Sequence, residues 1–374
     1  MEIFVNSRQI NSNNIVDSDV QSMLLPLNLL QNVFFCPKYR IKNNYITPTN
    51  LMSNLISSIA TLVFIIMYAY RNYLIGLFKT SQFSTAWKYS SYFNGFCYSL
   101  GFIMNLVIGI IQSQNSVQFV LTFQNVHRFL KNENGFRSFI IWNWVAVCLT
   151  LVYYVFFFIY QYTRGTIGKI HACVGFLLSS FDFNVVYATR LLRLLEYQLV
   201  LWNNRFFKLR ETSDIRDKDI IQKLFNAYAN ILECYDIIKI SFQHYVSFTL
   251  QLIIDLLKYA ANNDCQKTVI IAIRVSIAVL LWLIKNLMWQ MTFSHQCERL
   301  YLANERTLDH CAFILTSYCS GMEKRLCKNV LRMSRVRFSK LRVCGLFYAG
   351  AALQLSLIAL LADYTIVLLQ LAFL

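Results

Sequence analysis

The chain has 374 residues, of which 56% are hydrophobic and only 14% are charged, and its formal net charge is +16. Soluble domains carry about 25% charged residues, so this composition excludes an ordinary soluble domain and predicts an all-α polytopic membrane protein. The basic residues lie between the apolar segments, where the positive-inside rule accounts for them. We therefore expect membrane lipid, and no nucleic acid, among the partners of the protein.

The first 48 residues are polar, and we expect them to lie in the cytosol. All three prolines of the chain occur in this segment. It ends on a basic flank of Lys38, Arg40 and Lys42, which favours the cytosolic side. Thr47 and Pro48 then predict the start of the first membrane helix, because proline suits the first helical turn.

Seven apolar segments are long enough to cross a bilayer, for which about 20 apolar residues suffice. The segment 113–137, between the second and third of them, is polar and predicts a loop. The predicted membrane helices are Leu51–Leu77, Ser90–Gln112, Phe139–Tyr160, Ile170–Thr189, Ile238–Leu257, Val269–Met291 and Gly345–Leu374.

Two further regions are helical in pattern but too charged to lie in lipid, and we expect them to project into the cytosol. The first consists of two long helices joined near Glu211–Asp219, and the second contains a basic helix around Lys324–Arg342. The predicted division of the chain is 1–48 as a cytosolic N-terminal segment, 49–189 as transmembrane helices 1–4, 190–237 as cytosolic helical extensions, 238–292 as transmembrane helices 5–6, 293–343 as a cytosolic anchor region and 344–374 as a terminal helix.

The distribution of Lys and Arg predicts the orientation. Of the 35 basic residues, 26 lie in the N-terminal segment and the second, fourth and sixth loops, and seven lie in the opposite loops. This asymmetry predicts a cytosolic N-terminus and, after seven crossings, an extracellular C-terminus. That orientation is the reverse of a G-protein-coupled receptor, and the predicted spans also contain no proline.

No sequence pattern points to catalysis. The chain has no Gly-rich phosphate loop, no nucleophile elbow and no metal-binding helix, so we expect neither an enzyme nor a cofactor. It also has no internal repeat, which gives no support to an inverted-repeat transporter.

Five charged residues fall within the predicted spans, where a charge costs about 2.5–3.5 kcal/mol on insertion scales. Asp255 and Lys285 are expected near the membrane faces, where their side chains can reach water. Asp182 and Arg274 are expected to face each other across the bundle. They could form a salt bridge that fixes helix packing, or they could bind a ligand. The fifth charge, Asp363, lies in the terminal helix.

The predicted extracellular half of the bundle is rich in aromatic residues, and small-molecule pockets have apolar and aromatic walls with a few directed polar groups. The same residues could instead be ordinary membrane anchors or core residues. The candidate ligand-binding residues are Tyr92, Phe96, Tyr153, Tyr154, Phe157, Phe176, Ser180, Asp182, Gln251 and Arg274.

The terminal helix is the strongest candidate for a functional element. One helix cannot enclose a pore, but four copies around an axis can. The alternative interpretation is a helix that faces lipid or packs against its neighbours. Residues at spacings of three and four place one set of side chains on a single face of this helix. That face consists of Leu360, Asp363, Val367, Gln370, Leu371 and Leu374.

A short pattern in this helix resembles a signature of insect gustatory receptors, which is Thr-Tyr, five hydrophobic residues and Gln-Phe. In this chain, Asp363 and Tyr364 are followed by five residues and then by Gln370 and Leu371. Asp363 therefore replaces Thr, and Leu371 replaces Phe. The preceding Gly345–Phe347 resembles the Gly-Leu-Phe that opens the same helix in that family.

The resemblance implies that four subunits each contribute the terminal helix to a cation pore. Carried over to this chain, Val367 is the hydrophobic gate, and Gln370 and Leu371 narrow the path beside it. It also implies a ligand pocket in each subunit that opens to the outside, and cytosolic helices that anchor the subunits together.

The function implied is a ligand-gated, non-selective cation channel of the plasma membrane that acts as a gustatory chemoreceptor. We expect a homotetramer, or a heteromer with other gustatory receptors, that conducts cations when a small tastant binds. A bitter or deterrent plant compound is the expected ligand, with a sugar as the alternative. The other classes left open are a seven-helix G-protein-coupled type of chemoreceptor without a pore, and a transporter.

Overall fold

The structure is a computed structural model of the chain. The residues that it describes are 14–78, 85–131, 133–162, 165–211, 218–261, 269–317, 320–343, 347–353, 355, 356, 359 and 363.

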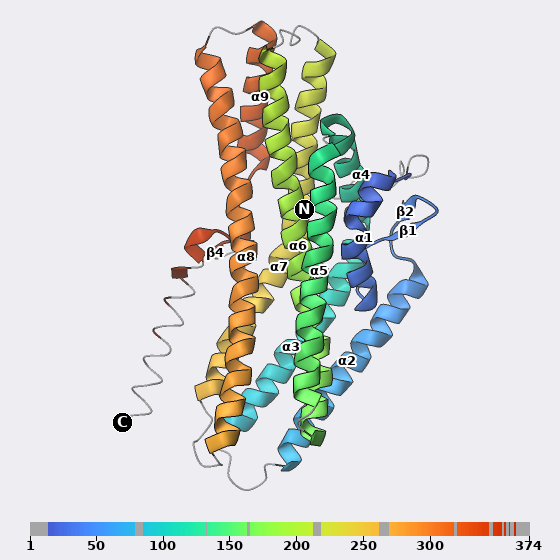
Figure 1. The fold of residues 1–374 in the computed structure, drawn as a ribbon, viewed down its shortest axis with the longest axis vertical. Coiled ribbons are helices and arrows are strands. Elements are labelled where there is room, and N and C mark those ends of the chain that lie inside the picture. Colours follow the sequence, from blue (N-terminus) through green and yellow to red (C-terminus); the bar gives the residue numbers. More distant parts are fainter. Residues whose placement is uncertain are drawn as a thin grey trace.

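The described part is almost entirely helical (Figure 1). Figure 1 shows α6, α7 and α8 side by side along the long axis, with α9 against their upper ends and α5 beside their lower part. α2 and α3 pass obliquely across the lower part of the bundle, and α1 packs on α5. The helices are α1 (Ser18–Val33), α2 (Leu51–Phe78), α3 (Thr85–Ile111), α4 (Ser113–Leu130), α5 (Glu133–Tyr162), α6 (Gly165–Glu211), α7 (Lys218–Ala261), α8 (Val269–Thr316) and α9 (Gly321–Arg337).

The three central helices are much longer than a membrane crossing requires. α6, α7 and α8 have 47, 44 and 48 residues, and a helix of this size is about 70 Å long. The hydrocarbon core of a bilayer is about 30 Å thick, so a large part of each helix must extend beyond it if the helix crosses. The expected break near Glu211–Asp219 is confirmed, because α6 ends at Glu211 and α7 begins at Lys218.

By length and composition, three helical segments in the described part can cross a membrane, namely Leu51–Tyr73, Phe136–Tyr160 and Ala172–Leu209. A fourth is possible if Gly95–Ile111 and Ser113–Leu130, which meet at 55°, form one broken span. These segments indicate a helical membrane protein. The full set of seven spans and their orientation stay predictions.

The predicted loop 113–137 is wrong, because most of it forms the helix α4. Its buried side chains, such as Val117, Val120 and Phe123, recur at spacings of three and four and face the bundle, where α4 packs mainly against α7. A second helix, α1, was also not expected, since it contains Pro26 and lies in a polar segment. Both helices are stabilised by packing against the bundle rather than by a long apolar run.

A small hairpin separates α1 from α2. β1 (Arg40–Lys42) pairs with β2 (Tyr45–Thr47), and the two turn residues Asn43 and Asn44 have φ angles of 52° and 67°, as a tight hairpin turn requires. The predicted helix start at Thr47 and Pro48 is therefore wrong. Instead, α2 starts at Leu51, because the side chain of Asn50 accepts a hydrogen bond from the Ser53 amide at 3.0 Å.

The buried apolar residues form two clusters. The larger cluster joins α1, α4, α5, α6, α7, α8 and α9, and Trp202, Tyr228 and Phe206 are among its fully buried residues. The smaller cluster lies between α2, α3 and α6 and includes Tyr68, Tyr98 and others. After α9, the short hairpin of β3 (Arg342–Val343) and β4 (Phe347–Tyr348) leads toward the terminal segment.

Candidate functional site

Two charged side chains meet in the interior of the bundle. The Lys285 ammonium of α8 lies 2.5 Å from a carboxylate oxygen of Asp182 of α6, and these side chains are only 3% and 5% exposed. The hydroxyl of Tyr154, from α5, donates a hydrogen bond to the same carboxylate. Lys285 also donates to that hydroxyl at 3.3 Å. One polar cluster therefore joins three helices.

The cluster explains how the charges of Asp182 and Lys285 can be buried, although burial of an isolated charge has a high free-energy cost. A buried ion is tolerated when a partner and further hydrogen bonds compensate for its lost hydration. Asp182 receives hydrogen bonds from both Lys285 and Tyr154, so its charge is well compensated. Removing one partner of such a pair typically costs about 3–5 kcal/mol because the other charge stays buried. The cluster thus fixes α5, α6 and α8 relative to one another.

The expected partner of Asp182 was Arg274, but the structure pairs it with Lys285. The expectation that Lys285 reaches the membrane surface is also wrong, since its side chain is buried. Positions 274 and 285 are about three turns apart on one helix face, so periodicity alone could not distinguish them. The pairing depends on how far α8 is shifted along α6.

A chain of amides continues from this cluster toward the N-terminal segment. Asn184, two residues after Asp182, donates to the side-chain oxygen of Asn105 in α3 at 3.1 Å. Gln31 of α1 donates to Asn184 at 3.5 Å, and Asn105 donates to the Cys36 sulfur at 3.2 Å. These bonds position α1 and the segment after it against the centre of the bundle.

Among the predicted ligand-binding residues, Tyr153, Tyr154 and Phe157 lie together on α5. The Tyr153 ring is stacked on Phe157 at 6.4 Å and meets Tyr154 edge to face at 5.4 Å between centroids. Within the described part, the hydroxyls of Tyr153 and Ser180 are buried without a hydrogen-bond partner. Such hydroxyls are available to a bound polar group or to water.

Other predicted ligand-binding residues lie apart from the cluster. Tyr92 and Phe96 of α3 are each 65% exposed, as expected of side chains that face lipid. Phe176 of α6 is also exposed, although its ring contacts that of Phe34 at a centroid distance of 5.1 Å. The structure therefore does not bring these three residues together with Tyr154.

Several predicted positions lie outside the described residues or side chains. Gln251 and Arg274 fall within α7 and α8, but their side chains are not among those described. Of the predicted pore residues, Asp363 is described and is exposed. The pore positions outside the described residues are Val367, Gln370, Leu371 and Leu374.

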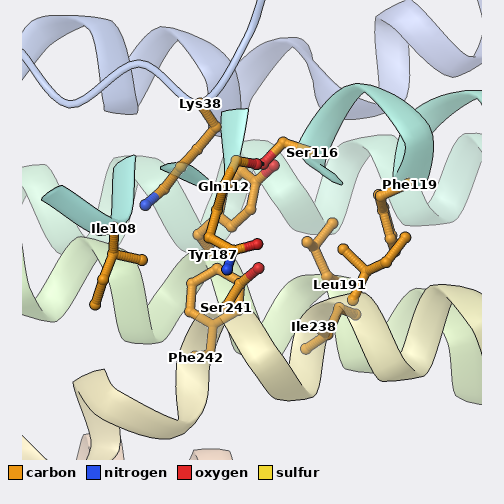
Figure 2. Close-up of a pocket in the computed structure, with 11 residues that line it drawn as sticks. Lys38, Ile108, Gln112, Ser116, Phe119, Tyr187, Leu191, Ile238, Ser241 and Phe242 are labelled. Carbon is orange, nitrogen blue, oxygen red and sulfur yellow. The ribbon is translucent and has the colours of Figure 1, made fainter. Parts of the chain in front are cut away.

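A small cavity lies where α3 bends into α4, beside α6 and α7 (Figure 2). Figure 2 shows Lys38, Gln112 and Ser241 directed toward the same space. The cavity has a volume of about 20 Å³, which is room for about one water molecule and not for a tastant. Its lining residues are Lys38, Ile108, Gln112, Ser116, Phe119, Tyr187, Leu191, Ile237, Ile238, Ser241 and Phe242.

Lys38 is the basic residue of this cavity, and its burial was not expected from the sequence. Its side chain is only 5% exposed, and its ammonium lies 5.7 Å from the centroid of the Phe242 ring. Burial lowers the pKa of Lys38 to about 8, while the nearby Cys36 thiol acts in the opposite direction. Lys38 is therefore a structural cation of the bundle rather than a solvated flank at the membrane surface.

No protein-family model matches the chain, and no curated protein matches its sequence significantly. The resemblance to insect gustatory receptors, which depends on the short motif in the terminal segment, therefore stays a prediction.

The buried ion pair leads to a test by a double-mutant cycle. We expect Asp182→Asn and Lys285→Met each to destabilise the protein by about 3–5 kcal/mol, because each leaves one charge buried without its partner. The loss of unfolding free energy in the double variant should be smaller than the sum of the losses in the two single variants. Thermal unfolding of the detergent-solubilised protein measures this. Tyr154→Phe is the control, since it keeps both charges. Strict additivity of the two effects would contradict the pairing.

The buried Lys38 leads to a test by pH. Because its pKa is lower in the folded chain than the usual 10.5, the unfolded chain binds more protons between about pH 8 and 10.5. Stability should therefore rise with pH across this window, and a pKa difference of one corresponds to about 1.4 kcal/mol. Lys38→Met should abolish this rise, as seen in unfolding temperatures at pH 7.5 and 9.5. The exposed Lys42→Met is the control, and an unchanged pH dependence in Lys38→Met would contradict the assignment.

Proposed function

We propose that the chain is one subunit of a ligand-gated, non-selective cation channel that acts as a gustatory chemoreceptor in the plasma membrane. In this proposal, four copies assemble around an axis, and the terminal helix of each copy contributes to the pore. A small tastant, in our expectation a bitter or deterrent plant compound, binds within the helix bundle of each subunit and opens the pore.

Two features of the bundle support a membrane receptor. Its central helices are long enough to cross a bilayer and still extend well beyond it. Its interior holds a compensated charge cluster of Asp182, Lys285 and Tyr154, and ionisable groups among membrane helices commonly mark functional sites. The partnerless hydroxyl of Tyr153 lies one residue away from this cluster in the sequence.

The observation that carries the proposal is the exposure of the described residues in the terminal apolar segment. Leu353 is still buried at 7% exposure, but Leu355 is 70% exposed, and Ala359 and Asp363 are exposed as well. An apolar segment that is not covered by its own subunit must be covered by lipid or by another copy. Identical copies around a closed axis would give each terminal segment the same neighbours.

The pore then follows from the chemistry of one helix face. A ring of four Val367 side chains can close the path by excluding water, and a ring of Gln370 amides can support passing hydrated cations. A ligand opens such a gate only if it binds the open arrangement more tightly than the closed one. Because the cluster of Asp182 and Lys285 ties α5, α6 and α8 together, a ligand beside it would act on all three helices.

The gate assignment predicts the effect of a single truncation. Val367→Ala should raise the basal current about tenfold, since a shift of about 1.4 kcal/mol in the closed–open equilibrium corresponds to a factor of ten. Whole-cell current without ligand, normalised to surface expression, measures this. Leu369→Ala, which lies on the opposite side of the same helix, is the control. An unchanged basal current in Val367→Ala would contradict the pore assignment.

The orientation of the chain separates this proposal from a G-protein-coupled type of receptor. We expect an epitope tag at the C-terminus to be accessible to antibody on intact cells and a tag at the N-terminus to be accessible only after permeabilisation. Labelling of the N-terminal tag on intact cells would reject the proposed channel topology. A ligand-evoked current must accompany the expected result, because uptake without current would indicate a transporter.

A further inference from the structure

A basic concavity lies where α7 meets the segment between α9 and the terminal residues. It is open to the outside, and its volume is about 510 Å³, far larger than the cavity beside Lys38. Its lining residues are Lys239, Ser339, Lys340, Arg342 and Tyr348. Three of these five side chains are cations, and the other two are hydroxyls that can donate hydrogen bonds.

The positive charge of the concavity is only partly balanced. Asp236 lies 3.0 Å from the Lys239 ammonium, which also donates to the Ser339 hydroxyl at 2.9 Å. The Lys340 ammonium lies 5.4 Å from the centroid of the Tyr301 ring, and the lining itself includes no carboxylate. The lining therefore presents three cations and no carboxylate of its own to an anion.

The surrounding backbone is held firmly, so the basic side chains project from a fixed frame. The Tyr235 hydroxyl donates to the Ser339 carbonyl at 2.9 Å, and the Leu341 amide donates to the Tyr301 hydroxyl at 2.9 Å. Arg342 stands opposite Tyr348 in the β3–β4 hairpin and donates to its hydroxyl at 2.9 Å. A fixed frame lowers the entropic cost of binding.

The place of the concavity in the chain points to the membrane surface. Lys239 lies at the predicted start of the fifth span, where the sequence changes from charged to apolar. Arg342 lies just before the apolar terminal segment. Clusters of basic residues at the cytosolic boundary of membrane helices are suited to anionic lipid headgroups.

We propose that this concavity is a binding site for a phosphate-bearing anion, such as the multiply phosphorylated headgroup of a membrane lipid. Lys340 and Arg342 provide charge-assisted hydrogen bonds to phosphate oxygens, and Arg342 can bind two of them at once. Lys239 and the hydroxyl of Ser339 or Tyr348 complete the coordination. A soluble inositol phosphate offers the same chemistry and is the other possible source.

Occupation of the site would bridge α7 and the β3–β4 hairpin. Since this hairpin leads toward the terminal segment, the bound phosphate would restrain the segment that we propose to line the pore. Binding itself does not depend on the channel proposal, and only an effect on current rests on it. The test below therefore uses binding, so that the two proposals can fail separately.

The test compares full-length protein with the variant Lys340→Gln/Arg342→Gln in detergent. The probes are short-chain phosphatidylinositol bisphosphate, inositol trisphosphate and inorganic phosphate, and affinity is measured by microscale thermophoresis at physiological salt. We expect the lipid or the inositol phosphate to bind, and the variant to bind it at least about tenfold more weakly, since hydrogen bonds to charged groups contribute strongly. If the lipid binds more tightly than inositol trisphosphate, the natural ligand is a membrane lipid. If inositol trisphosphate binds more tightly, the natural ligand is a soluble inositol phosphate.

Matched variants exclude a general effect of charge. Lys324→Gln/Arg325→Gln removes the same charge from the exposed start of α9, away from the concavity, and should bind as the wild type does. Lys340→Arg keeps the charge at this position and leaves Arg342 in place, so it should retain most of the affinity. Absence of binding to every probe would overturn the proposal. Equal weakening in the α9 variant would overturn it too, because the effect would then come from net charge.

Discussion

The arrangement of the bundle depends on one buried interaction, the pairing of Asp182 with Lys285. Each charge would be expensive among apolar helices on its own, so the two can be buried only if α6 and α8 are correctly aligned. Tyr154 adds α5 to the same point. A small shift of one helix along another can keep apolar side chains in contact. The same shift would separate the two buried charges and leave each without its partner. The pair therefore acts as a registry element for the three helices that enclose the candidate ligand region.

Polar contacts extend this constraint to the N-terminal segment. Asn184 and Asn105 link α6 with α3, and Gln31 and Cys36 connect them to α1 and the residues after it. Lys38 is buried beside the bend between α3 and α4, where its ammonium contacts Phe242 of α7. Gln31, Cys36 and Lys38 are thus held within the bundle, so a rearrangement of the bundle would change the contacts of α1 and of the residues after it.

The C-terminal segment differs from the bundle in the exposure of its described residues. Of the described residues after the β3–β4 hairpin, Ala349 and Leu353 are buried, whereas Leu355, Ala359 and Asp363 are exposed. In the proposed assembly, the exposed residues of this segment would be covered by lipid or by another copy. In the proposed channel, the packed bundle would bind the ligand and the terminal segment would form the gate.

The sequence by itself determined the membrane class, the positions of the long helices and their breaks, because apolar runs and the charged stretches between them are local features. It did not reveal α4, which is stabilised by packing on α7, or the burial of Lys38. It also could not choose Lys285 over Arg274 as the partner of Asp182, since both positions share one face of α8. Only the tertiary structure decided these points, because the shift and rotation of one helix against another depend on contacts between distant parts of the chain.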